Sequence, residues 1–186
     1  MALKRTSSTP YAILGLLGLE PMSGYDIRRT LQETLSHFWS ESFGQIYPAL
    51  AKLARAGLVR AVETGPAARG RGGRRVYALT PRGRAALARW RRQAPVERPF
   101  RNELLLKLFV SDARSAPVLR AHLLPLQRAE RAHLAAYGTL RRRIAREAAD
   151  HPSREAWLLT LRYGELRSRA VLAWCVEATR ALARRP

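Results

Sequence analysis

The residue types that could carry out covalent or metal chemistry are few in this sequence, and their spacing does not favour such chemistry. The 186 residues contain no phosphate-binding loop, no dinucleotide fingerprint after a strand, no nucleophile elbow and no zinc-protease motif. The four histidines do not stand at metal-ligand spacing: His37, His122, His133 and His151. The single cysteine, Cys175, lies on a helical apolar stripe, where we expect a buried, unreactive thiol. The sequence therefore predicts neither an enzyme nor a metal or cofactor site.

Basic residues indicate a different chemistry, the binding of a polyanion. The chain has 34 Lys and Arg against 14 Asp and Glu, a net charge of +20, and only Lys4, Lys52 and Lys107 are lysines. Such a balance points first to nucleic acid and second to an anionic membrane, although a genome composition that favours arginine also raises it. Residues 1–98 hold 17 basic and 6 acidic residues, and residues 99–186 hold 17 and 8. Charge alone therefore does not locate the site.

The first sixty residues carry the start signals of three helices. A Thr-Pro pair stands at Thr9-Pro10, an Asp-containing variant of the capping box at Ser23–Asp26, and an S-x-x-Q capping box at Ser42–Gln45. Apolar residues follow each signal at helical spacing. Pro48 lies inside the third helix and should bend its first turn. The expected helices cover residues 10–18, 24–35 and 43–56.

After the third expected helix, the spacing of apolar residues changes from the helical period to an alternation of apolar and polar residues. Residues 58–63 and 75–79 alternate apolar and polar side chains and flank a Gly- and Arg-rich loop over 64–74. This pattern predicts a β-hairpin with a long basic tip. A second Thr-Pro pair, Thr80-Pro81, opens a fourth helix, which stops before a linker that begins at Pro95. Three helices followed by a two-stranded hairpin are the order of a winged helix-turn-helix.

Beyond the linker we expect a short apolar segment at 100–110 and two long helices over 116–148 and 153–183. The last helix carries apolar and small residues near heptad positions: Trp157, Leu161, Gly164, Ser168, Val171, Cys175, Thr179 and Leu182. This stripe favours an antiparallel helical hairpin that packs on a partner chain, and an intramolecular bundle is the alternative. The predicted fold is thus mainly α. It has a winged helix-turn-helix over 1–94, a linker over 95–99 and a long-helix dimerisation domain over 100–186.

In a winged helix-turn-helix the third helix enters the major groove and the wing reaches a neighbouring groove. The polar residues of the third helix that its apolar stripe does not need are Ser42, Gln45, Tyr47 and Lys52. Gln45 can read an adenine edge through two hydrogen bonds, and the two hydroxyls can contact phosphate. Two alternatives stay open, because Ser42 can serve only as a cap and Tyr47 only as core. The wing contributes Arg69, Arg71, Arg74 and Arg75.

Three motifs in these elements resemble the PadR family of bacterial transcriptional regulators. The family patterns S-G-Y-D/E-I, G-Q-I-Y-P-x-L and V-Y-x-L-T-x-x-G are met at 23–27, 44–50 and 76–83, within a resemblance that covers about 9–92. Residues 99–183 are similar to the C-terminal region of the longer, virulence-activator type. One departure is Ala54, where many members carry an acidic residue.

The resemblance implies a homodimer that binds a palindromic operator through Tyr25, Ser42, Gln45, Tyr47 and the wing arginines, with the C-terminal helices as dimerisation domain. It also implies repression that a small aromatic or amphiphilic effector relieves. Trp90, beside the linker, and Trp174, on the last helix, are the candidate effector residues, in a site between the two domains.

Taken together, the sequence favours a homodimeric repressor of double-stranded DNA without catalytic activity. It has no run of 18 apolar residues and no cleavable leader, so we expect a soluble, cytoplasmic protein that does not bind membranes. Two other classes remain. One is a small-molecule sensor whose four tryptophans line a cavity, and the other is a charge-driven nucleic-acid-binding protein without operator specificity, which sequence preference distinguishes from a regulator.

Overall fold

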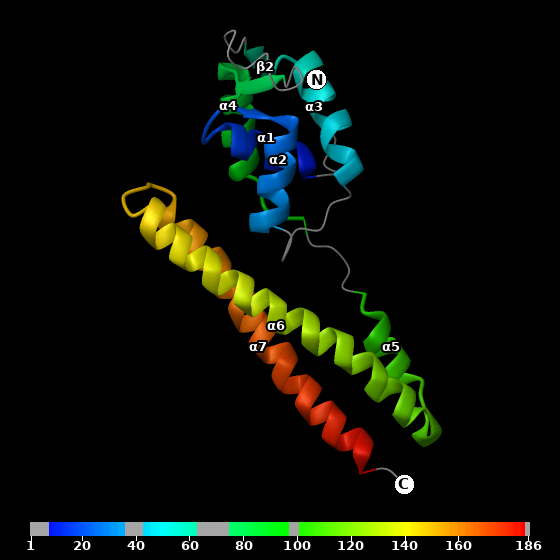
Figure 1. Ribbon diagram of the computed structural model, residues 1–186. Helices are drawn as coiled ribbons and strands as arrows, with labels where there is room; N and C mark the ends of the chain where they lie inside the picture. The colour runs from blue at the N-terminus through cyan, green and yellow to red at the C-terminus, as the bar shows by residue number, and fades with distance from the viewer. Residues whose placement is uncertain (1–7, 36–42, 63–74, 97–100, 185–186) are drawn as a thin grey trace. The chain divides into compact units, whose positions relative to one another are not determined.

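The computed structural model describes residues 8–35, 43–62, 75–96 and 101–184 (Figure 1). The chain forms two compact units, residues 1–97 and 98–186, called unit 1 and unit 2 below. No helix in the described ranges is long and apolar enough to cross a membrane.

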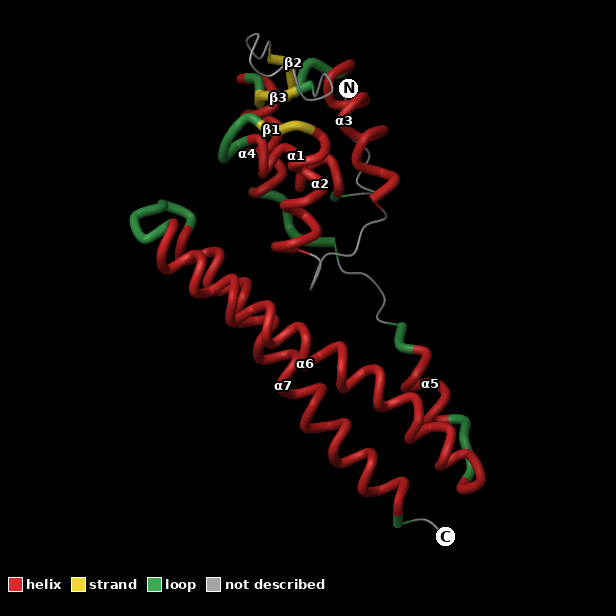
Figure 2. The backbone as a smooth tube through the Cα atoms, in the orientation of Figure 1, coloured by secondary structure: helices red, strands yellow, loops and turns green. Residues whose placement is uncertain are grey.

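Unit 1 is helical with one small sheet, shown in yellow in Figure 2. In chain order its elements are α1 (Thr9–Leu17), β1 (Met22–Ser23), α2 (Gly24–Thr30), the π-helical turn η1 (Leu31–Leu35), the 3-10 turn η2 (Phe43–Gln45), α3 (Ile46–Arg55), β2 (Val59–Val62), β3 (Val76–Leu79) and α4 (Pro81–Arg91). The mainly α class and the winged-helix order predicted from the sequence are confirmed.

Only some of the predicted helix-start signals are found in the structure. The capping box at Ser23–Asp26 is present, with Ser23 Oγ accepting from the Asp26 N–H at 3.2 Å and the Asp26 carboxylate accepting from the Ser23 N–H. The expected cap at Thr9 is wrong, since α1 begins at Thr9 and follows Ser8. Helix α3 also begins later than expected, after η2, and Pro48 is its third residue. A first-turn N–H has no acceptor within a helix, so Pro48 removes no hydrogen bond there.

The sheet has three strands, whereas the sequence predicted two. Both pairs are antiparallel, in the order β1-β3-β2. Val59 faces Leu79 and Val62 faces Val76 across the β2–β3 pair, while Ser23 of β1 faces Val76. Strand β1 has only two residues, too few to show an alternating pattern. The hairpin tip, 63–74, lies outside the described residues.

The core of unit 1 lies where α1, α2, α3 and α4 meet the sheet. Its fully or nearly fully buried members come from every one of these elements: Ile13, Leu14, Ile27, Ile46, Leu50, Leu53, Val59, Leu79 and Leu87. Helix α1 contacts both α3 and α4 as well as β3. The three-residue and four-residue steps of the apolar positions thus place each helix with one face inward.

A tight junction joins the end of α3 to the start of α4. Gly57 ends α3 in the left-handed conformation, with φ at +67°. The Thr80 hydroxyl contacts the carbonyl oxygens of Gly57 and Leu58 at 2.8 and 3.0 Å and accepts from the Gly83 N–H at 3.0 Å. A Cβ at Gly83 would overlap the Leu58 carbonyl oxygen. Only glycine lets the first turn of α4 lie this close to the chain that leads into β2.

Unit 2 consists of α5 (Glu103–Phe109), the 3-10 turn η4 (Ala113–Ser115), α6 (Ala116–Glu147) and α7 (Arg154–Ala183). Helices α6 and α7 run antiparallel, as Figure 1 shows. The stripe predicted to face a partner chain packs on α6 instead: Leu161, Gly164, Ser168 and Cys175 are buried within the chain. Gly164 makes this possible, because a Cβ there would overlap the ring of Tyr137. For this stripe the intramolecular alternative is correct.

Burial also settles the chemistry of Cys175. Its side chain has no exposed surface, and burial, together with the charge of Glu130, raises the pKa of the thiol. The raised pKa keeps the thiol protonated, and burial makes it inaccessible. The buried thiol predicted from the sequence is confirmed.

A buried carboxylate, Glu130, links the two long helices. It is only 3% exposed. Ser168 Oγ donates to it at 2.5 Å, and Arg167 Nη2 at 3.0 and 3.2 Å, both from α7, while His133 Nδ1 lies 3.3 Å away. Burial by itself raises the pKa of Glu130, but the Ser168 and His133 hydrogen bonds and the Arg167 charge outweigh burial and bring it below its ordinary value of 4.5. The folded hairpin therefore favours the ionised form.

Glu130→Gln should weaken the α6–α7 hairpin by about 1–3 kcal/mol near pH 7, because a charged acceptor of buried hydrogen bonds is lost. The folded state lowers the pKa, so the ionised carboxyl contributes stability above about pH 4.5, and that contribution is lost as the pH falls through the lower folded pKa. The difference between wild type and variant in urea unfolding, followed by circular dichroism, should therefore shrink below pH 4.5.

Glu155→Gln is the matched control, because Glu155 lies on α7, pairs with Arg154 and is largely exposed. Its effect should stay below about 1 kcal/mol at every pH. A Glu130→Gln deficit that does not change with pH would show that the charge of Glu130 contributes nothing.

Candidate nucleic-acid interface

Helix α3 divides into a buried and an exposed face. Ile46, Leu50 and Leu53 are buried in the core of unit 1. The opposite face exposes Tyr47 and, one and two turns further along the helix, Ala51 and Arg55, with Pro48 and Lys52 beside them. The side chain of Tyr47 is 54% exposed, so its alternative role as a core residue is wrong.

Tyr47 rests on the first turn of α2. A Cβ at Gly24 would lie 2.8 Å from Cε1 of Tyr47 and 3.3 Å from Cδ1 of Leu50, so glycine leaves the space that the tyrosine ring fills. The next residue, Tyr25, is 45% exposed. The capping box that begins α2 and the contact at Gly24 thus bring Tyr25 and Tyr47 to neighbouring parts of one surface.

Gln45 stands directly before α3 as its N-cap residue. Its side chain is exposed and makes no capping hydrogen bond. The expected S-x-x-Q capping box would have used this amide, but its other member, Ser42, lies outside the described residues. Within the described residues the Gln45 amide has no hydrogen-bond partner, so its donor and its acceptor are open to a ligand.

Exposed basic side chains lie on this helix and on the hairpin that follows it. Lys52 and Arg55 lie on α3, Arg60 on β2 and Arg75 directly before β3, and none of them forms an ion pair with a carboxylate of the described chain. Arg69, Arg71 and Arg74 lie outside the described residues. Arg55 and Arg60 were missed by the sequence reasoning. The step of eight residues from Tyr47 to Arg55, about two helical turns, was the signal that could have found Arg55.

The two candidate effector residues belong to different units. Trp90 of α4, 37% exposed, stacks on Tyr11 of α1 with ring centroids 4.8 Å apart and planes 8° from parallel. Trp174 lies on α7 in unit 2, where it lines a hollow. Trp90 thus already has an aromatic partner within unit 1. Within the described ranges no cluster of His, Cys, Asp and Glu could hold a metal ion.

An exposed, basic third helix followed by an antiparallel hairpin defines unit 1 as a winged helix-turn-helix, a class of DNA-binding domain. Residues 13–89 match the transcriptional regulator PadR-like family, and residues 100–183 match the virulence activator alpha C-terminal domain. The chain thus carries a domain of the PadR-like family of transcriptional regulators, followed by a virulence activator alpha C-terminal domain.

Similar proteins agree with this assignment. The negative transcriptional regulator PadR of Bacillus subtilis is 37% identical over 100 residues, which cover 53% of this chain and 54% of that protein. The chain thus spans about half the length of the curated relatives it matches. The solved structure of the Vibrio cholerae virulence activator AphA has a TM-score of 0.74 at 29% identity and covers 95% of this chain and 98% of its own.

Bacillus subtilis PadR in complex with operator DNA also has a TM-score of 0.74, at 27% identity, and covers 95% of this chain and 99% of its own. The similarity to both solved structures covers 95% of this chain, whereas the alignments with the curated relatives cover 53% and 44% of it.

Gly24→Ala should destabilise unit 1 by about 1–3 kcal/mol, because the new methyl group presses on the Tyr47 ring. Alanine is otherwise preferred in a helix by up to about 1 kcal/mol. In a Tyr47→Ser background the same substitution should therefore be close to neutral or stabilising. The four proteins of this double-mutant cycle are compared by urea unfolding. An equal loss in both backgrounds would show that Tyr47 does not rest on Gly24.

Proposed function

We propose that this protein is a homodimeric transcriptional repressor that binds a palindromic operator. The observation that carries the proposal is the exposed face of α3, where Gln45, Tyr47 and Lys52 present polar groups with no hydrogen-bond or ion-pair partner in the described chain. Two findings support it: the structure of Bacillus subtilis PadR with operator DNA, and the description of that relative as a negative regulator. DNA binding is assigned to residues 1–94 and dimerisation to 100–186, joined by 95–99, in a cytoplasmic protein without catalytic activity.

Each side chain has a role set by its chemistry. The Gln45 amide can donate to N7 and accept from N6 of adenine, which reads one base pair in the major groove. The Tyr25 and Tyr47 phenols and the Ser42 hydroxyl suit phosphate oxygens, which position the protein without reading sequence. The cations suit the same phosphates: Lys52, Arg69, Arg71, Arg74 and Arg75.

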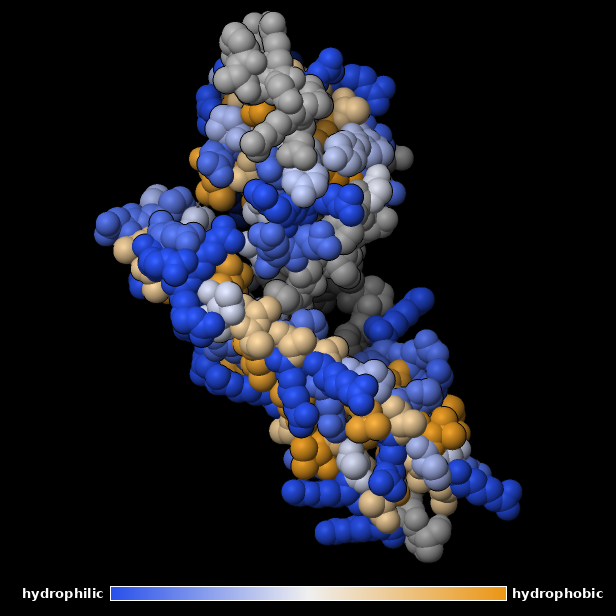
Figure 3. Space-filling model, viewed as in Figure 1, coloured by the Kyte–Doolittle hydropathy of each residue, from blue (hydrophilic) through white to orange (hydrophobic). Residues whose placement is uncertain are grey.

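Dimerisation is proposed on a second stripe of α7. Leu159, Tyr163, Leu166, Ala170 and Ala173 follow one another at steps of four, three, four and three residues. Tyr163 follows Leu161 by two residues, about 200° around the helix, so this stripe faces away from α6. Leu159, Tyr163 and Leu166 are 69%, 65% and 50% exposed. Apolar side chains at heptad spacing suit another helix, and a two-fold axis supplies the same stripe from a second copy. Figure 3 shows apolar side chains among hydrophilic ones on the visible face of unit 2.

Relief of repression by a small aromatic or amphiphilic effector is the third part of the proposal. The structure of Bacillus subtilis PadR with p-coumaric acid, 27% identical with a TM-score of 0.70, supports a ligand of this class. Trp174 and Trp90 remain the candidate contacts, each within its own unit. A ligand lowers operator affinity only if it binds the DNA-incompetent state more tightly.

Gln45→Ala should cost about 1–3 kcal/mol on the operator and relax discrimination at one base position in each half-site. The operator is first located by footprinting the DNA upstream of this protein's own gene. Affinities for the operator, for operators altered at single positions and for random duplex are then measured at one salt concentration. Wild type should prefer its operator over random duplex by about 10³-fold or more.

Lys52→Gln is the contrasting variant. The loss of a phosphate contact should weaken binding to all duplexes by a similar factor. If Gln45→Ala also weakens all duplexes equally, Gln45 reads no base. If wild type shows no preference among duplexes, the protein binds nucleic acid by charge alone and the repressor proposal is wrong.

Leu166→Glu should separate the dimer, since the two-fold axis brings two new carboxylates into one apolar interface. We expect the dimer dissociation constant, measured by sedimentation of the full chain, to rise at least about 100-fold, or about 2.8 kcal/mol. Leu106→Glu on α5 is the control, because Leu106 is similarly exposed but lies off the stripe. A Leu166→Glu protein that stays dimeric would place the interface elsewhere.

A further inference from the structure

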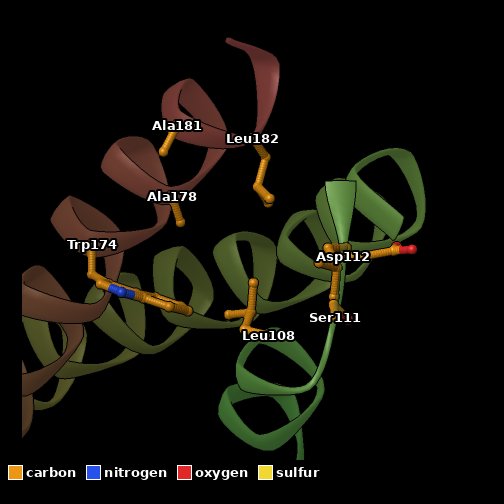
Figure 4. Close-up of a pocket in the computed structure, with 8 residues that line it drawn as sticks. Leu108, Ser111, Asp112, Trp174, Ala178, Ala181 and Leu182 are labelled. Carbon is orange, nitrogen blue, oxygen red and sulfur yellow. The ribbon is translucent and has the colours of Figure 1, made fainter. Parts of the chain in front are cut away.

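Unit 2 contains a hollow of about 230 Å³ between α5, the start of α6 and the end of α7 (Figure 4). Its walls are mostly apolar: Trp174, Ala178, Ala181 and Leu182 from α7, Leu108 from α5 and Leu119 from α6. In Figure 4 the Trp174 ring extends from α7 toward Leu108. The hollow is smaller than the roughly 300–1,000 Å³ of sites for drug-sized ligands, so it suits one aromatic ring or a short alkyl chain.

The polar side chains at the edge of the hollow are already engaged. Ser111 Oγ donates to the Lys107 carbonyl oxygen at 2.5 Å. Asp112 Oδ1 accepts from the N–H and the hydroxyl of Ser115 at 3.1 and 2.9 Å. In Figure 4 the Asp112 carboxylate also points away from Trp174. These two side chains therefore offer little to a ligand, and the hollow itself selects an apolar group.

A second hollow of about 370 Å³ adjoins the first at Leu182, which lines both. It differs from the first in charge, because Arg114 and Arg120 line it. Several arginines of α6 and α7 hold a carboxylate of the chain, as Arg141 holds Glu165 and Arg167 holds Glu130. Arg114 and Arg120 have no such partner in the described part of the chain, and both are exposed. Two unpaired guanidinium groups suit an anionic group.

We propose that unit 2 binds a small amphiphilic carboxylate, with its apolar part against Trp174 and its carboxylate at Arg114 and Arg120. This inference rests on the effector part of the proposed function and narrows it in two respects. The ligand is an anion. The site lies within α5, η4, α6 and α7, so Trp90 takes no part in it.

The experiment uses the full chain without DNA and the probe 3-phenylpropionate, with 3-phenylpropanol as its uncharged counterpart. Binding is measured by calorimetry and by tryptophan fluorescence. We expect one carboxylate per chain, with a dissociation constant below about 1 mM and tighter than that of the alcohol. The fluorescence change should disappear in Trp174→Phe and persist in Trp90→Phe.

Two variants test the two parts of the site. Arg114→Gln with Arg120→Gln should weaken the carboxylate at least about tenfold and leave the alcohol unchanged, since only the charge-assisted contact is lost. Arg128→Gln with Arg131→Gln is the matched control, because both arginines are exposed on α6 and form no ion pair in the described chain. Ala178→Leu should fill the hollow and weaken both probes.

The arginine variant keeps the proposal falsifiable even if Ala178→Leu does not fold. The proposal is wrong if the carboxylate does not bind below about 1 mM, if it binds the arginine variant as it binds wild type, or if Trp90→Phe removes the signal. Ala178→Leu gives a further test. If this variant changes the oligomeric state measured by sedimentation but leaves ligand binding unchanged, a partner chain fills the hollow and the proposal is wrong. None of these results depends on DNA, so the operator experiment stands or fails separately.

Discussion

The close approach of α4 to the Leu58 carbonyl is the constraint on which the shape of unit 1 depends. Gly83 has no Cβ to keep the helix away, and the Thr80 hydroxyl joins the two segments by contacting the Gly57 and Leu58 carbonyls. This junction ties the end of α3 to the start of α4 and so sets where β2 and β3 leave the core. A displaced junction would move the hairpin relative to α3, and the two would no longer meet one duplex together.

The separation of α3 into a buried face and an exposed face explains the candidate interface. Leu50 and Leu53 are buried in the core of unit 1, and this burial stabilises α3 without using its outer face. Tyr47, Lys52 and Arg55 are therefore left for a partner. In the described part of the chain these cations and the Gln45 amide have no partner, and such a set suits a polyanion whose sequence is also read.

Helix α7 of unit 2 packs on α6 and also carries both proposed binding surfaces of this unit. The stripe of α7 that contains Gly164 and Ser168 packs on α6, where Glu130 fixes which residues face each other. The stripe that contains Tyr163 and Leu166 stays exposed and is available to a second chain. Toward its end, α7 also forms the wall of the hollow that Trp174 lines. Intramolecular packing, proposed dimerisation and proposed ligand binding thus occupy different faces or ends of the same helix.

The sequence by itself determined the order of the α-helices and of the β2–β3 hairpin, because capping boxes, Thr-Pro pairs and changes of apolar period are local signals. It also indicated Gln45, Tyr47 and Lys52 as the exposed side of α3 and Cys175 as buried. Strand β1, the role of Gly83 and the assignment of the two α7 stripes were decided only by the tertiary structure. A heptad stripe indicates that a helix packs against another helix, but it does not indicate whether that other helix belongs to the same chain. In this protein the other helix is α6 of the same chain. The Tyr137 ring of α6 packs on Gly164 of α7, and this contact is possible only because Gly164 has no Cβ.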